Sequence, residues 1–148
     1  MPYIDLLSQE DYVSIFYSAN TPTATVGGFD PEKPLIAMMH PLHMDSSWLY
    51  PQLDDPRLRD KYNIIVFDTR VTGRSVYRFN GKYDLWVTAA DLAHAFHYLG
   101  LPAAHWFASE IFSFAVCRLA AMYVPSFLHK QSRVADAWFS ASQSYVSA

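Results

Sequence analysis

The stretch from Ala103 to Tyr123 limits the possible folds of this chain more than any other part of it. Its beginning, Ala103–Ala108, is a short run of apolar and aromatic residues, which predicts a buried strand. Its end, Ser113–Tyr123, has apolar residues three or four positions apart, which predicts a helix. The chain must therefore turn sharply at Ser109–Ile111. Such a turn places Glu110 at the carboxyl edge of a sheet, where the N–H groups of the helix start are also directed.

The length and charge of the chain exclude several classes of protein. Its 148 residues suffice for one domain with one core. Its net charge of −3 provides no basic surface for phosphates, so we expect no nucleic-acid partner. The single cysteine, Cys117, cannot form an internal disulfide, and its spacing places it on one helix face with Phe114 and Ala121. We therefore expect Cys117 to be a small core residue in a reducing compartment.

Neither a signal peptide nor a membrane span is expected. The segment 1–13 contains acids where a signal peptide needs basic residues and an apolar run. The most apolar region, Ala103–Val124, is interrupted by His105, Glu110 and Arg118, whereas a span needs about 20 residues nearly free of charge. We expect a cytoplasmic protein that does not associate with membranes.

Short apolar runs and helical periodicity predict the other elements. Two strands, Tyr3–Leu6 and Tyr12–Tyr17, flank a polar bend. Continuous apolar runs at Leu35–Met39 and Asn63–Phe67 predict strands that are buried on both faces of a parallel sheet. The periodicity of Trp86–Leu99 predicts a helix. Alternation of strands and helices in this order indicates an α/β domain with right-handed crossovers.

Some elements can be predicted in more detail. Ser46 or Ser47 is expected to cap a short helix that ends near Leu53, and Asp54–Asp60 to be an irregular polar connection. Gly100 is expected to end the Trp86–Leu99 helix as its C-cap. One face of that helix is expected to lie in the core, with its aromatic side chains. Its residues are Trp86 or Val87, Ala90, Leu92, Ala93, Phe96 and Leu99.

The character of the sequence changes at Pro125. Residues 125–148 are rich in serine, and only Ala135–Val146 has a weak apolar face, which is equally consistent with a marginal helix and with a loose tail. We therefore expect an α/β domain over residues 1–124 and a divergent tail over residues 125–148.

Three segments, in the same order along the chain, resemble the α/β-hydrolase fold superfamily. His40-Pro41-Leu42, followed by Trp48, resembles the His-Gly-x loop after the third strand of that fold, and Asp68–Ser75 resembles the Asp-x-Arg-Gly-x-Gly-x-Ser segment after the fourth. Asp91–His105 is similar to the helix and strand that lead into the nucleophile elbow. The resemblance covers about residues 12–124. It implies an incomplete, amino-terminal half of a hydrolase domain, with a partial, mostly parallel sheet and flanking helices.

Three residues depart from the pattern of this family. Pro41 and Val71 replace glycines, and Phe112 stands where a small residue normally allows the elbow helix to approach its strand. We expect Phe112 to push the helix away or to alter the turn.

The resemblance assigns Glu110 to the nucleophile position and the N–H groups of Leu42 and Ile111 to the pocket for a developing oxyanion. It implies hydrolysis of esters or related small apolar substrates, with a carboxylate nucleophile as in the dehalogenase and epoxide-hydrolase branches. Two alternatives stay open. Glu110 can be an acid favoured by the dipole at a helix start, and a register shift of one residue would make Ser109 the nucleophile.

Other polar residues of the resembling segments are expected to be structural. His40, Asp68 and Arg70 are expected to shape their loops by hydrogen bonds, and Ser75 to be a cap. A metal site at His40 and His43, together with His105 or Glu110, is disfavoured because the spacing of the two histidines lies on a loop without a fixed helical face. We expect no metal and no other cofactor.

After Glu110 the chain contains one histidine, His129, and one acid, Asp136, in the reverse of the order found in the family. The triad is therefore incomplete, and we expect this chain alone to be weakly active or inactive. The alternatives are a pseudoenzyme, that is, a truncated, non-catalytic remnant or small-ligand-binding module of the same fold, and a truncated product that does not fold alone. The strand Ala103–Ala108 would then be a sheet edge, which favours self-association.

Overall fold

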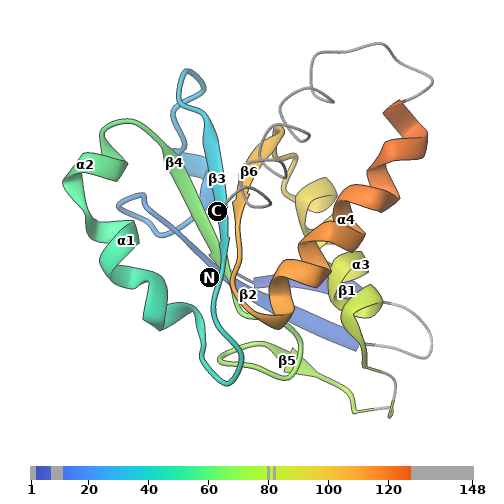
Figure 1. Cartoon of the computed structure of the whole chain (residues 1–148). Helices are drawn as coiled ribbons and strands as arrows, with labels where there is room; N and C mark the ends of the chain where they lie inside the picture. The colour runs from blue at the N-terminus through green and yellow to red at the C-terminus, as the bar shows by residue number, and fades with distance from the viewer. Residues whose placement is uncertain (1–2, 8–11, 80, 82, 128–148) are drawn as a thin grey trace.

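A computed structural model describes residues 3–7, 12–79, 81 and 83–127 of the chain. In this part the chain forms one six-stranded sheet with helices on both faces (Figure 1). The strands are β1 (Tyr3–Leu7), β2 (Tyr12–Ala19), β3 (Leu35–Met39), β4 (Asn63–Phe67), β5 (Val76–Tyr77) and β6 (Ala104–Phe107). The predicted α/β class is confirmed. The predicted strands are confirmed as well, while the two-residue strand β5 was not expected. The prediction that the strand within Ala103–Ala108 is buried is wrong, because His105 and Phe107 of β6 are exposed at an edge of the sheet.

The sheet has the order β1-β2-β4-β3-β6, with β5 paired to β2. β3 lies between β4 and β6 and is parallel to both, whereas β2 pairs antiparallel with β1, β4 and β5. Within the described part of the chain β6 pairs on one side only, so it forms an edge of the sheet. The carboxyl ends of three parallel strands therefore meet at the same side of the molecule, where the loops that follow them converge.

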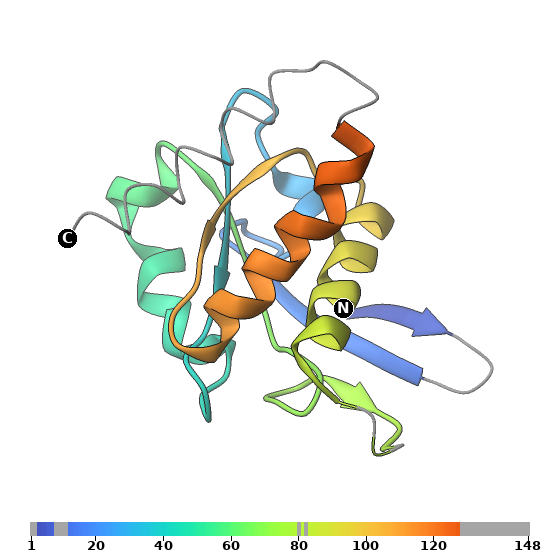
Figure 2. The same ribbon diagram turned by 45° about the vertical axis from the view of Figure 1, so that its right-hand side comes forward.

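Helices cover both faces of the sheet (Figures 1 and 2). Helices α3 and α4 pack against each other on one face, and the short helices α1 and α2 lie on the opposite face. The helices are η1 (Val26–Gly28), η2 (Ser46–Leu49), α1 (Tyr50–Asp54), α2 (Pro56–Arg59), α3 (Leu85–Tyr98) and α4 (Ile111–Phe127). Within the described residues no helix is long and apolar enough to cross a bilayer.

Alternation along the central strands supplies a core on each side of the sheet. In β4, Ile65 and Phe67 face α3 and α4, while Ile64 and Val66 face α1 and α2; all four side chains are fully buried. This burial on both faces explains why the sequence of β4 is a continuous apolar run and does not alternate between apolar and polar residues.

The segment between β3 and β4, which contains η2, α1 and α2, differs from the sequence expectation. The cap of the short helix is Asp45, whose carboxylate accepts a hydrogen bond from the Ser47 N–H, rather than Ser46 or Ser47 itself. The connection 54–60 is not irregular, since it contains α2, capped by Asp55. The Asp55-Pro56 pair is a helix-start signal, because the proline sits at the first helical position where no N–H is needed.

The buried face of α4 also differs from the predicted one. The residues that face the core are Phe112, Ala115 and Leu119, whereas Phe114 is 61% exposed and Cys117 is exposed. The prediction that Cys117 is a core residue is therefore wrong. In a helix with many apolar residues, spacings of three and four residues fit several faces. Which face of α4 is buried depends on the direction in which the preceding turn places the first residue of the helix.

Helix α4 continues to Phe127, beyond the predicted end at Tyr123 and through Pro125. A proline near the last turn removes one backbone donor, but its fixed φ is compatible with a helix. In α3 the side chain of Trp86 is 52% exposed and that of Val87 is half-buried, so Trp86 is excluded of the two alternatives for the core face. The buried residues of that helix are Thr88, Ala89, Asp91, Leu92 and Ala95, and Ala93, Phe96 and Leu99 pack partly buried against the core. The tail from residue 128 on lies outside the described residues.

Candidate active site

Glu110 lies at the turn between β6 and α4. Its φ is +53°, in the left-handed region that glutamate rarely occupies, and α4 begins at the next residue, Ile111. The Glu110 carbonyl accepts hydrogen bonds from the N–H and the hydroxyl of Ser113, which fixes the first turn of the helix. The predicted strand, tight turn and helix are therefore present around this acid, and its side chain is exposed at the edge of the sheet.

The Glu110 carboxylate binds a main-chain N–H of the neighbouring loop. The Leu42 N–H donates to Glu110 Oε2 at 2.9 Å, across 68 positions of sequence. Leu42 follows β3 and Glu110 follows β6, and these strands are adjacent and parallel. The Ile111 N–H belongs to the first turn of α4, which has no acceptors within the helix, so the positive end of this helix also lies beside the carboxylate. Leu42 and Glu110, which the sequence places in one site, thus come into direct contact.

His40 connects three parts of the site from a fully buried position. Its Nδ1 lies 2.9 Å from the Pro41 carbonyl, which can only accept, so Nδ1 carries the proton. Its Nε2 lies 3.2 Å from the Thr72 hydroxyl in the loop after β4. The imidazole ring packs edge-on against Phe112, with 5.0 Å between ring centroids.

Phe112 is 1% exposed. Its ring contacts His40, so it joins the elbow helix to the loop after β3. Whether Phe112 moves α4 away from its strand stays an expectation.

Asp68 organises the loops after β3 and β4. Its carboxylate is buried and accepts hydrogen bonds from the Ser46 N–H at 2.6 Å and the Arg74 N–H at 2.7 Å. Gly73 has φ +53°, and a Cβ at this position would lie 2.1 Å from Asp68 Oδ2. Ser75 is not a helix cap; its hydroxyl donates to the Asp68 carbonyl and accepts from the Phe16 N–H of β2.

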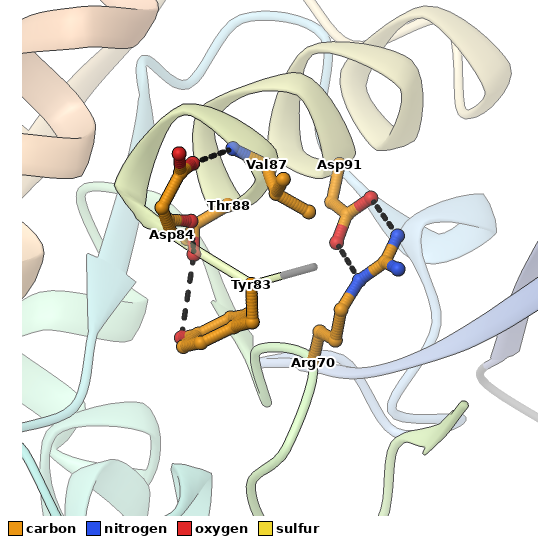
Figure 3. Close-up of polar contacts among 6 residues, drawn as sticks. All are labelled: Arg70, Tyr83, Asp84, Val87, Thr88 and Asp91. Atoms are coloured by element: carbon orange, nitrogen blue, oxygen red, sulfur yellow. Dashed lines mark hydrogen bonds and ion pairs between the residues drawn. The ribbon is translucent and has the colours of Figure 1, made fainter. Parts of the chain in front are cut away.

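Arg70 fastens the same loop to α3 through a buried ion pair (Figure 3). Its Nε and Nη2 atoms donate to the two carboxylate oxygens of Asp91 at 2.9 and 2.8 Å. The start of α3 is fixed nearby by Asp84, which caps the helix by accepting a hydrogen bond from the Val87 N–H (Figure 3). The Asp84 carboxylate accepts a second hydrogen bond from the Trp86 N–H. The sequence did not predict the partner of Arg70. The sequence does contain a signal for this partner, namely an acid, Asp91, on the apolar face of α3. A buried carboxylate requires a partner of opposite charge or hydrogen-bond donors.

A cavity of about 580 Å³ opens in front of these loops. Leu42 and Phe112 contribute to its wall and lie directly beside Glu110, and Trp48 and Tyr83 provide large apolar surfaces. His43 also lines the cavity. The volume lies within the range of small-molecule sites.

The charged groups of the cavity wall are few. Hydrogen bonds from the Ser47 hydroxyl and N–H lower the pKa of the Asp45 carboxyl below its usual range, because they favour its ionised form. The described residues contain no group of three or more histidine, cysteine or acidic side chains that could hold a metal ion. The Ser109 hydroxyl beside the turn is buried without a hydrogen-bond partner in the described part of the chain. His129 and Asp136 lie outside that part.

No protein-family model matches the sequence, and no curated protein matches it. Solved structures do match the fold. A carboxylesterase structure from Nitrososphaera gargenis superposes with a TM-score of 0.66 at 17% identity, covering 81% of this chain and 41% of that one. A hydrolase from Pseudomonas aeruginosa PA01 gives a TM-score of 0.60 at 20% identity, covering 76% of this chain and 38% of that one. An N-acyl homoserine lactonase gives 0.62 at 18% identity, covering 83% and 42%.

These matches define the class of the fold. The chain has a partial α/β-hydrolase fold, a mixed, mostly parallel sheet with flanking helices, as its three sequence segments predict. It spans less than half the length of the solved structures that it matches.

Proposed function

We propose that this chain carries the nucleophile part of a hydrolase site, in which the Glu110 carboxylate attacks a small apolar electrophile. The observation that supports this function is the 2.9 Å hydrogen bond from the Leu42 N–H to Glu110 Oε2, at a strained turn beside a cavity. A carboxylate nucleophile needs one oxygen that attacks and a second oxygen that is held by a main-chain donor. Oε2 occupies the second position, and Oε1 is the attacking oxygen.

The reaction that fits this arrangement is attack on a saturated carbon, for example in an epoxide. Oε1 forms a bond to the epoxide carbon, the C–O bond of the ring breaks, and the ring oxygen takes a proton from water. In the resulting ester of Glu110, Oε2 is the carbonyl oxygen. Water then loses a proton to a base as it attacks Cδ, and the negative charge develops on Oε2, where the Leu42 N–H stabilises it. The Cδ–Oε1 bond breaks, and the diol leaves with Oε1 after that oxygen takes the proton back from the base.

Ester substrates, which the sequence resemblance implies, fit this arrangement less well. Attack of a carboxylate on an ester gives an anhydride, and the substrate oxyanion would compete with Oε2 for the Leu42 N–H. We therefore expect higher reactivity toward epoxides than toward short-chain aryl esters of similar size.

We propose His43 as the base for the second step. It lines the same cavity as Leu42, and imidazole is the side chain that most often accepts a proton from an attacking water near neutral pH. In His43→Gln the first step should proceed and the ester of Glu110 should accumulate, which intact-protein mass spectrometry detects. If the ester turns over equally fast in the variant, His43 has no part in the second step.

The test of the proposed nucleophile is covalent labelling. Incubation with styrene oxide should add the mass of one epoxide to the peptide that contains Glu110. During turnover in ¹⁸O-labelled water the label should enter the Glu110 carboxylate, because water attacks Cδ. Glu110→Gln should abolish both signals, whereas Glu32→Gln, an exposed glutamate of another loop, should retain them. Labelling of other side chains only would contradict the assignment.

The same hydrogen bond also favours a second candidate function, a non-catalytic module that binds small apolar molecules. In that case Glu110 fills the main-chain anion site permanently, and the cavity beside it serves for binding. A folded protein that binds styrene glycol or a similar aryl alcohol, but forms no adduct with the epoxide, would favour this function over the first.

A further inference from the structure

A second cavity, of about 670 Å³, lies on the face of the sheet that carries α1 and α2. Aromatic rings of three elements contribute to its wall: Tyr3 of β1, Phe16 of β2 and Tyr50 of α1. Tyr3 and Phe16 pack edge to face, with 5.3 Å between centroids. The cavity shares no lining residue with the one beside Glu110.

Arg74 presents its guanidinium group to this cavity between two aromatic rings. Its Cζ lies 4.7 Å from the centroid of Phe16 and 5.8 Å from that of Tyr50, so both rings orient the planar group. The backbone of Arg74 is fixed independently, since its N–H donates to the buried Asp68 carboxylate. Among the described residues no acid forms an ion pair with Arg74.

Arg59 of α2 lines the same cavity and also lacks an acidic partner in the described part of the chain. By contrast, Arg57 on the same helix is paired with Asp55 at 2.6 Å. Among the residues that line the cavity there are two arginines and one acid, Asp54, in a chain whose net charge is −3. Two further carboxylates lie near Arg74 without lining the cavity, those of Asp45 and Asp68.

From this combination we infer that the cavity binds a small aromatic carboxylate. The guanidinium fork of Arg74 matches the two oxygens of a carboxylate, and Arg59 adds a second positive charge. The rings of Tyr3, Phe16 and Tyr50 provide the apolar surface for a planar ligand body. This site is separate from the proposed Glu110 chemistry and does not depend on it.

The test uses 2-naphthoate as the fluorescent probe and 2-naphthamide as its neutral analogue. Wild-type protein should bind the naphthoate more tightly than the amide. Arg74→Gln should weaken naphthoate binding by about tenfold or more and leave amide binding nearly unchanged, because only the charged hydrogen bonds are lost. Arg59→Gln, on the exposed surface of α2, should weaken naphthoate binding in the same direction.

Arg57→Gln is the matched control, since it removes an arginine of the same helix that is already paired and does not line the cavity. It should bind the naphthoate like the wild type. Circular dichroism and the thermal midpoint establish that each variant is folded. Equal weakening by Arg57→Gln and Arg74→Gln, or equal affinity for the acid and the amide, would overturn the inference, and so would an absence of naphthoate binding at millimolar concentration.

Discussion

At the scale of single residues, backbone strain is concentrated at the candidate active site. Four residues other than glycine have positive φ, namely Ala24, His43, Val71 and Glu110, within the described part of the chain. His43 and Val71 line the cavity beside Glu110, so three of the four lie at one site. Such conformations cost on the order of 1–3 kcal/mol each and persist only where the surrounding structure enforces them. Strain of this kind is typical of sites that must hold a side chain in one position.

Val71 allows this strain to be measured. Its φ is +71°, which is especially unfavourable for a β-branched residue, and its side chain is 40% exposed. Val71→Gly should therefore raise the free energy of unfolding by about 1 kcal/mol, since relief of strain exceeds the greater entropy of glycine in the unfolded chain. Urea denaturation measures the change.

Val76→Gly is the control for that experiment. Val76 is also exposed, but it lies in β5 and does not have a positive φ, so the same substitution should lower stability by about 0.5–1 kcal/mol. A loss of stability in both variants would mean that the backbone at position 71 is not strained.

The sequence allows some of these residue contacts to be predicted but not others. The proximity of Leu42 to Glu110 follows from a resemblance that orders the strands, because the ends of neighbouring parallel strands must meet. The exposure of Cys117 and the burial of Phe112 could not be predicted, since the apolar positions of α4 fit more than one face. Only the direction of the turn at Glu110 decides between those faces.

At the scale of elements, the loop after β4 joins the parts of the site. Within it, Arg70 binds α3, Thr72 contacts His40, and Arg74 binds the Asp68 carboxylate through its N–H. Strands β3 and β4 could be predicted with their exact bounds, because each is a continuous apolar run that ends at a polar residue. The polar contacts of the loop could not, since each depends on a partner far away in the sequence.

The ion pair between Arg70 and Asp91 should contribute most of the stability of the contact between the loop after β4 and α3. The two side chains are 4% and 9% exposed, so a variant that removes one charge breaks a bidentate contact of the other in a buried environment. Asp91→Asn should lower the free energy of unfolding by about 3–5 kcal/mol in urea denaturation. The double variant Arg70→Met/Asp91→Leu should recover part of that loss, because it removes both buried charges together.

Arg57→Ala is the comparison for the buried pair. It removes one partner of an ion pair on the exposed surface of α2 and should change the stability far less than Asp91→Asn. Similar losses in the two variants would show that the bidentate contact with Arg70 has no special weight.

At the scale of the whole molecule, the sheet ends at β6 within the described residues. This strand pairs with β3 from Leu35↔Ala104 to Met38↔Phe107, and its other side has no strand beside it. Phe107 of β6 is 45% exposed. An edge with unpaired backbone groups and no lysine or proline can pair with the same edge of a second copy. We therefore propose that the chain self-associates through β6.

A charge at this edge should prevent the association. Two copies of Phe107→Lys would bring like charges together where their strands meet, so the variant should sediment as a monomer at concentrations at which the wild type forms larger species. Phe79→Lys introduces the same charge at a phenylalanine that is 79% exposed in the loop after β5, and it should sediment like the wild type. Sedimentation velocity over a range of concentrations distinguishes the two variants. A wild-type protein that stays monomeric throughout, or an equal effect of both substitutions, would show that β6 is not the contact, because only Phe107 lies on that strand.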